Sequence, residues 1–144
     1  MSTYFQGSVK SGDGFSEAPN GVGVGTAVFS QTALIGFDSD LVQEAQFVVP
    51  NRGQLVDIIV DVLGAYNSAT SATLTVGSAS AGTQYAGAID AKTEGRVRPT
   101  FTAAQLAAMG DVGANTTVYA TITSVGQPTG GSVRVTLLYT GGVF

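Results

Sequence analysis

The stretch Leu55-Val-Asp-Ile-Ile-Val-Asp-Val62 decides the fold of this chain. Side chains of a β-strand point alternately to its two faces, so the stretch divides into two rows. One row is wholly apolar and β-branched, as suits a buried face, and comprises Val56, Ile58, Val60 and Val62. The other row mixes carboxylates with apolar side chains, as on a half-exposed face, and comprises Leu55, Asp57, Ile59 and Asp61. Helical spacing gives no clean polar stripe, and a one-residue shift would bury both aspartates. We therefore predict a central strand of well-defined register.

The composition indicates a single domain with an unusually uncharged surface. The 144 residues fit one domain with a sizeable core. Only 11% of them are charged, against about 25% in an ordinary globular domain, so Ser, Thr, Gly, Gln and Asn must cover the surface. Such a surface meets little charge repulsion when it associates with a partner. The formal net charge of −4, with six Lys and Arg in all, argues against binding to nucleic acid.

Several functional classes are disfavoured by residue types that the sequence lacks. There is no cysteine and no histidine, which removes disulfides, serine or cysteine triads, and thiolate or imidazole metal sites. No apolar run approaches the about 18 residues of a membrane span, and the N-terminus lacks a basic-then-apolar signal pattern. We therefore expect a non-enzymatic protein made in the cytoplasm, without membrane contact, cofactor, catalytic residue or metal site.

The first 25 residues differ from the rest of the chain because they are rich in Gly, Ser and Pro. We expect residues 1–25 to form a flexible arm and residues 26–144 to form a β-sandwich domain. Two interpretations of the arm stay open: a disordered leader, or a segment that orders against a neighbouring subunit. Tyr4-Phe-Gln-Gly-Ser8 also resembles the end of a cleavage tag, so its native origin is open. Gly21-Val-Gly-Val-Gly25 lacks the spacing of a phosphate loop and is interpreted as a linker.

Alternation of apolar and polar residues predicts six further strands. They span residues 27–37, 43–49, 72–76, 85–91, 116–124 and 132–140. In the first strand Phe29, Ala33, Ile35 and Phe37 share a face that Gln31 interrupts. We expect the last two strands to pair with each other, joined by a projecting loop at 125–131.

One short helix is predicted at residues 102–109, between the strands. Thr102 and Gln105 have the spacing of a capping box, and four alanines favour the helix. Phe101 and Leu106 have the spacing of a hydrophobic staple, and Gly110 is expected to supply a left-handed stop.

Acidic pairs offer the only conventional site chemistry in the sequence, and neither pair supports it. Asp57 and Asp61 share a strand face about 13 Å apart, which does not suit paired-carboxylate catalysis across a cleft, so we expect them to face Arg or solvent. Asp38 and Asp40 lack the further oxygen ligands of a calcium loop, and we interpret them as a turn.

Basic residues gather after the strand at 85–91. Lys92, Arg96 and Arg98 are close in sequence, and Arg52 would join them if the fold brings it near. One interpretation is a patch for an anion or a partner. The other, which we favour, is pairing with Asp90, Glu94 and other acids on a solvated edge. At the C-terminus, Phe144 follows Gly141-Gly142, and either frays or docks on a partner.

The strand sequences of the C-terminal half resemble those of a known class of proteins. They are Ala-Thr-Leu-Thr-Val-Gly (72–77), the segment 85–95, Val-Tyr-Ala-Thr-Ile-Thr (118–123) and Gly-Ser-Val-Arg-Val-Thr-Leu-Leu-Tyr (131–139). This phrasing resembles small structural proteins of tailed-bacteriophage virions, of the head-decoration or capsid-cement type. The resemblance implies a β-sandwich on the virion surface that binds the lattice of the major capsid protein and stabilises it, often as a homo-oligomer. No set of family residues is carried over with it.

A second function from another class shares the sandwich and the Thr-rich surface. It is a receptor-binding or carbohydrate-binding module of a phage tail or a cell surface. Sugar-stacking modules use exposed aromatic platforms, whereas this chain has no Trp and only 8% aromatic residues. The composition therefore favours assembly over sugar binding.

Overall fold

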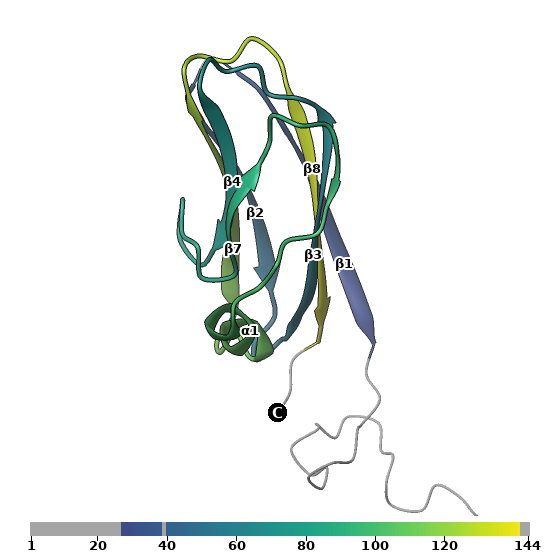
Figure 1. Ribbon diagram of the computed structural model, residues 1–144. Coiled ribbons are helices and arrows are strands. Elements are labelled where there is room, and N and C mark those ends of the chain that lie inside the picture. The colour runs from purple at the N-terminus through teal and green to yellow at the C-terminus, as the bar shows by residue number, and fades with distance from the viewer. Residues whose placement is uncertain (1–26, 39, 142–144) are drawn as a thin grey trace, which may run out of the picture.

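The described part of the chain forms two sheets that face each other (Figure 1). The computed structural model describes residues 27–38 and 40–141. Sheet A has the strand order β1 (Val28–Gly36), β8 (Ser132–Thr140), β3 (Leu55–Gly64) and β6 (Gly95–Val97). Sheet B has the order β2 (Val42–Val49), β7 (Thr116–Val125), β4 (Ser71–Gly77) and β5 (Ala86–Asp90). All neighbouring strands are antiparallel. The predicted all-β sandwich with one short helix is confirmed.

The chain crosses from one sheet to the other at almost every connection. Only β4 and β5 are consecutive strands of the same sheet. This strand order is that of a jelly roll, in which two Greek keys fold into facing sheets. The predicted pairing of the strands at 116–124 and 132–140 is wrong, because β7 lies in sheet B and β8 in sheet A. The loop at 126–131 spans the gap between the sheets, and alternation within a strand carries no information about which sheet it joins.

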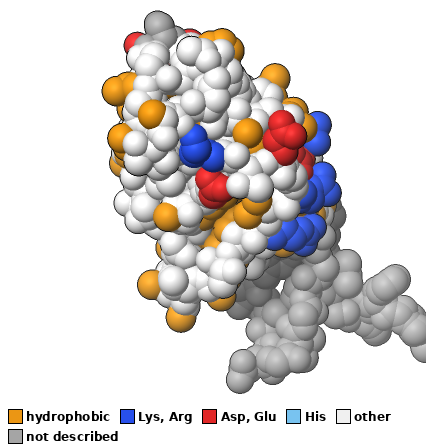
Figure 2. All heavy atoms as spheres, turned by 45° about the horizontal axis from the view of Figure 1, so that its top comes forward, with side chains coloured by type: hydrophobic (Ala, Val, Ile, Leu, Met, Phe, Trp, Pro, Cys, Tyr) orange, Lys and Arg blue, Asp and Glu red, His pale blue; other side chains and the backbone are white. Residues whose placement is uncertain are grey.

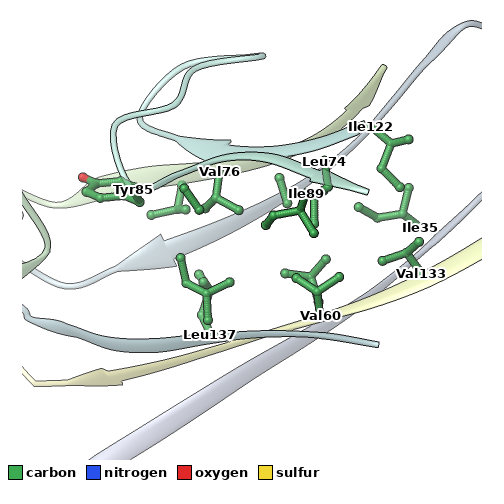
Figure 3. Packing of buried hydrophobic residues seen from close by; sticks show 14 of the residues in the cluster. Ile35, Val60, Leu74, Val76, Tyr85, Ile89, Ile122, Val133 and Leu137 are labelled. Carbon is green, nitrogen blue, oxygen red and sulfur yellow. The ribbon is translucent and has the colours of Figure 1, made fainter. Parts of the chain in front are cut away.

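The core lies between the two sheets and is made of their inward rows. Figure 3 shows Val60, Val133 and Leu137 of sheet A facing Leu74, Val76, Ile89 and Ile122 of sheet B. Each fully buried apolar side chain contributes about 1.5–3 kcal/mol to folding. Alternating apolar residues form the inward rows of three further strands, except that Tyr139 at the end of β8 is only partly buried. These rows are Leu74 and Val76 of β4, Val118, Ala120 and Ile122 of β7, and Val133, Val135 and Leu137 of β8.

A bulge at the start of β3 changes one part of the predicted pattern. Register with β8 shifts between Leu55 and Asp57, which leaves Val56 as the extra residue. Leu55 is therefore buried and Val56 is 44% exposed, the reverse of the prediction for these two residues. From Ile58 onward the predicted inward row holds.

The face predicted for the first strand is buried only toward its end. Ile35 is buried and Ala33 packs against the core, but Phe29 and Phe37 are 50% and 44% exposed. The reason is that β1 is the outermost strand of sheet A (Figure 1), so Phe29 is covered on one side, by Tyr139 at 5.9 Å between ring centroids.

A single helix, α1 (Ala103–Gly110), lies at one end of the sandwich within the described residues (Figure 1). Thr102 and Gln105 form the predicted capping box. The chain leaves the helix in an extended conformation at Asp111, φ −157°, so the left-handed stop expected at Gly110 is wrong. With eight residues, α1 is too short to cross a membrane, and the described residues contain no helix long and apolar enough to do so.

Candidate functional site

The most distinctive cluster of charged side chains lies on the outer face of sheet A. It comprises Asp57 and Asp61 of β3, Arg96 of β6, Arg98 directly after β6, and Arg134 of β8. We call this set the arginine face. Its positions follow from strand parity, because the neighbours of these residues in β3 and β8 point inward to the core.

Asp61 is the centre of the arginine face. The sheet places it directly opposite Arg96 on one side and Arg134 on the other. Arg96 donates from Nε to Oδ1 at 2.6 Å, and Arg134 donates to Oδ2 from Nε at 3.1 Å and from a terminal nitrogen at 2.8 Å. These side chains cover the carboxylate, so that Asp61 is only 7% exposed. The sequence predicts that Asp61 faces Arg or solvent, and in the structure it faces Arg. The half-exposed face predicted for this side of β3 is not found at Asp61, which is buried.

The two guanidinium groups hold Asp61 in its ionised form. Their hydrogen bonds, from Arg96 first and Arg134 second, lower the pKa of Asp61 from 3.8 to about 2, against the opposing effect of burial. The same contact with Asp61 raises the pKa of Arg96. Asp61 and Arg96 are therefore both charged at neutral pH.

The arginines keep exposed surface although each has an acidic partner. Arg98 pairs with Asp57 at 3.2 Å, and its side chain is 63% exposed. The side chains of Arg96 and Arg134 are 59% and 44% exposed. A guanidinium has five N–H donors in a planar fork, so donors remain that can bind carboxylates of a partner. Leu34, which lies opposite Arg134, is 64% exposed and adds apolar area beside the charges.

Sheet B carries charge of the opposite sign. Its four strands contain the acids Glu44 and Asp90 and no Lys or Arg. The rest of its outer face is rich in threonine, and the loop at 78–84 covers part of it, where the Ala81 N–H donates to Thr121 Oγ1 at 3.0 Å. In Figure 2 most of the Lys and Arg side chains lie at the right, with acidic side chains beside them, and most of the surface in that view is neither basic nor acidic. Three arginines against two aspartates leave the arginine face with one excess positive charge, whereas the strands of sheet B carry two acids.

The basic residues that the sequence groups together are only partly together in the structure. Arg96 and Arg98 share the arginine face, but Arg52 pairs with Asp111 at 2.8 Å and Lys92 donates to the Ser68 carbonyl. The interpretation of pairing with acids is confirmed, although Arg96 and Arg98 pair with Asp61 and Asp57 and not with Asp90 or Glu94.

Arg134 is the member of the arginine face that sequence reasoning missed. The alternation in Val-Arg-Val-Thr-Leu indicates that Arg134 points away from the core. It does not indicate that β8 lies beside β3, because the sequence prediction paired the strand of Arg134 with the strand at 116–124.

The other predicted sites take ordinary structural roles. Asp38 accepts hydrogen bonds from the Asp40 N–H at 2.7 Å and from Gln43 Nε2 at 3.1 Å, as in a turn. Within residues 27–38 and 40–141, no three His, Cys, Asp or Glu side chains lie close enough to hold a metal ion. The predictions for residues 1–25, including those at 4–8 and 21–25, and for Phe144 lie outside the described residues.

Comparison with known proteins shows what this fold resembles. No protein-family model matches the chain, and no curated protein matches it. Among solved structures, the chain is similar to a chain of the "Cyanophage Pam1 capsid asymmetric unit", with a TM-score of 0.56 and 21% sequence identity. The match covers 98% of this chain and 99% of the other. At this identity the likeness shows a shared fold, over the whole length of both chains.

Proposed function

We propose that this protein is a non-enzymatic structural component of a tailed-phage virion that binds the capsid lattice from outside and stabilises it. Its partner is the major capsid protein, and it acts as a homo-oligomer after synthesis in the host cytoplasm. The arm of residues 1–25 reaches a neighbouring subunit. Nucleic acid and membrane are not partners in this proposal.

One observation carries the proposal: the jelly roll matches a chain of a phage capsid asymmetric unit from end to end. Folds alone do not assign functions, and jelly rolls also occur in lectins and cupins. Here, however, the match covers 98% of this chain and 99% of the other, so neither matched sequence has a long segment outside the alignment. The strand sequences of the C-terminal half point independently to the same class of virion proteins.

The physical character of the surface supports attachment to a lattice. With 11% charged residues, the protein has few charges outside its contact surface, so neighbouring subunits on a lattice repel each other little. The arginine face offers half-exposed guanidinium groups, which are favoured at protein interfaces because they bind carboxylates with defined geometry. We therefore assign the arginine face as the surface that contacts the capsid, and the Thr-rich face of sheet B as the one that points to solvent.

Repetition on a lattice supplies the affinity that one small interface lacks. A capsid presents many identical sites, so contacts that are weak singly combine into avidity when subunits are linked.

The direct test is to mix the purified protein with undecorated heads of the phage that encodes it. We expect the protein to co-sediment with the heads at a saturating, whole-number ratio to the capsid protein, and to raise the temperature at which the heads break. Electron microscopy of the mixture would show added density on the outer surface of the lattice. Absence from the heads together with density at the tail tip would refute the proposal and favour the receptor-binding alternative.

A further inference from the structure

We infer that two copies of this chain pair along β1, in antiparallel register about Thr32, so that sheet A continues from one protomer into the other. The inference deepens the proposal of a homo-oligomer and rests on it. The four edge strands of the sandwich, β1, β6, β2 and β5, differ in length, regularity and charge.

The edge formed by β1 is long and regular, and no strand among the described residues covers it. The strand has nine residues and pairs with β8 on one side only. Its register with β8 runs from Val28 to Gly36 without a shift, so there is no bulge. The sequence Val-Phe-Ser-Gln-Thr-Ala-Leu-Ile-Gly contains no charge and no proline. Natural sheets usually block such an edge with lysine, proline, a bulge or a very short strand, and β1 has none of these.

The other three edges are shorter, and each is very short, irregular or charged. The edge strand β6 has only three residues. β5 has five residues, a positive φ of 44° at Ala88 and a register shift against β4. The edge of β2 has eight residues and carries the charge of Glu44. The Gln31 side chain also occupies the backbone of Val48 near one end of this edge: Nε2 donates to the Val48 carbonyl at 2.6 Å, and Oε1 accepts from the Val48 N–H at 3.4 Å. Among the described strands, β1 therefore has the longest edge without a charge, a bulge or an occupied backbone position.

The strand that fits this edge best is β1 of a second copy. Pairing about Thr32 satisfies both open edges at once, which gives a closed, two-fold dimer and no open-ended filament. The sequence is compatible with itself in this register, because no charges meet. Phe29, half-exposed in the protomer, would lie opposite Ile35 of the second copy, an aromatic and β-branched pair of the kind that stabilises antiparallel sheets. The other edges of the second copy are shorter and are very short, irregular or charged, so pairing of different edges is disfavoured.

Cysteine cross-linking tests the geometry in the full-length protein. The chain has no native cysteine, so Thr32→Cys introduces the single thiol. In the proposed register the two thiols lie directly across the two-fold axis, and mild oxidation is expected to give a disulfide-linked dimer at micromolar concentration. Thr123→Cys is the matched control, since Thr123 is an exposed strand threonine on the outer face of sheet B. Equal cross-linking of the two variants, or none at position 32, would overturn the inference. The latter result is expected if residues 1–26 cover the edge instead.

Charge substitutions test the same contact without covalent chemistry. Thr32→Lys places like charges opposite each other and is expected to raise the dimer dissociation constant at least about tenfold in analytical ultracentrifugation. Thr123→Lys is expected to leave it unchanged. An equimolar mixture of Thr32→Lys and Thr32→Glu is expected to restore the dimer as a heterodimer. A monomeric wild-type protein at about 100 µM, or a failed rescue with both variants folded by circular dichroism, would refute the dimer. Because no capsid is present in these measurements, that failure is distinguishable from failure to bind heads.

Discussion

Asp61 shows how two neighbouring strands determine what a single residue does. The sequence places it on the outer row of β3, where an exposed aspartate would be of little consequence. The sheet places an arginine on each side of it, and these side chains bury the carboxylate that they neutralise. An ion that is buried and paired costs much more to remove than an exposed one, because its partners lose their counter-charge.

We therefore expect Asp61→Asn to lower the melting temperature at pH 7 by roughly 4 °C or more. The pKa of Asp61 is about 2 in the folded protein, below the ordinary value of 3.8. The ionised carboxylate therefore stabilises the fold fully at a pH above 3.8, and this stabilisation is lost as the pH falls toward about 2. The difference between wild type and variant is thus expected to shrink between about pH 4 and pH 2. Asp57→Asn is the matched control, since Asp57 has one arginine partner at 3.2 Å and is more exposed. Thermal unfolding across this pH range is the measurement, and identical losses for the two variants would contradict the central role of Asp61.

At the scale of the element, β3 combines a sharply defined core row with a bulge. Val60 is fully buried between the sheets, whereas Val56 is the extra residue of the bulge and is 44% exposed. We expect Val60→Asp to unfold the protein, because an unpaired carboxylate would enter the apolar interior. Val56→Asp is expected to keep the fold and to lower the melting temperature by only a few degrees. Circular dichroism and soluble yield measure both, and unfolding by Val56→Asp would show that this residue faces the core, as the alternation alone predicts.

The sequence predicts elements better than it predicts their neighbours. Local alternation located every strand except β6, whose three residues are too few to show a period. The capping box at Thr102 is also local, so it was predictable. The bulge at Val56 was not, because it depends on register against β8, a strand about 80 residues later in the chain.

The same limit explains what was missed at the arginine face. Assigning β7 and β8 to different sheets requires knowledge of contacts between distant parts of the chain, which alternation does not contain. Without β8 beside β3, neither the burial of Asp61 nor the role of Arg134 follows from the sequence. The basic residues near β6 were recognised because they are close together in the sequence, whereas the partners that organise them are not.

At the scale of the whole molecule, the jelly roll separates two chemically different faces. Three arginines and two aspartates give the outer face of sheet A a net positive charge, while the strands of sheet B contribute two acids. Within a protein of net charge −4, the arginine face therefore holds a local excess of one positive charge, three arginines against two aspartates. If that surface docks on the capsid, the association is electrostatically steered and weakens as salt is added.

This polarity leads to a prediction that a purely structural role of the arginines would not produce. Arg98→Glu is expected to weaken binding to undecorated heads several-fold at low salt and to flatten its salt dependence, because the variant reverses a charge at the contact. Arg52→Glu is the matched control: Arg52 is also an exposed arginine with a single aspartate partner, but that partner is Asp111 beside α1 and not an aspartate of the arginine face. Sedimentation of heads with each variant at rising salt concentration measures the effect, after melting curves have shown that both variants are folded. Because the two substitutions change the net charge by the same amount, an equal loss of binding would mean that overall charge, and not the face of sheet A, directs attachment. Unchanged binding of Arg98→Glu would place the capsid contact elsewhere on the sandwich.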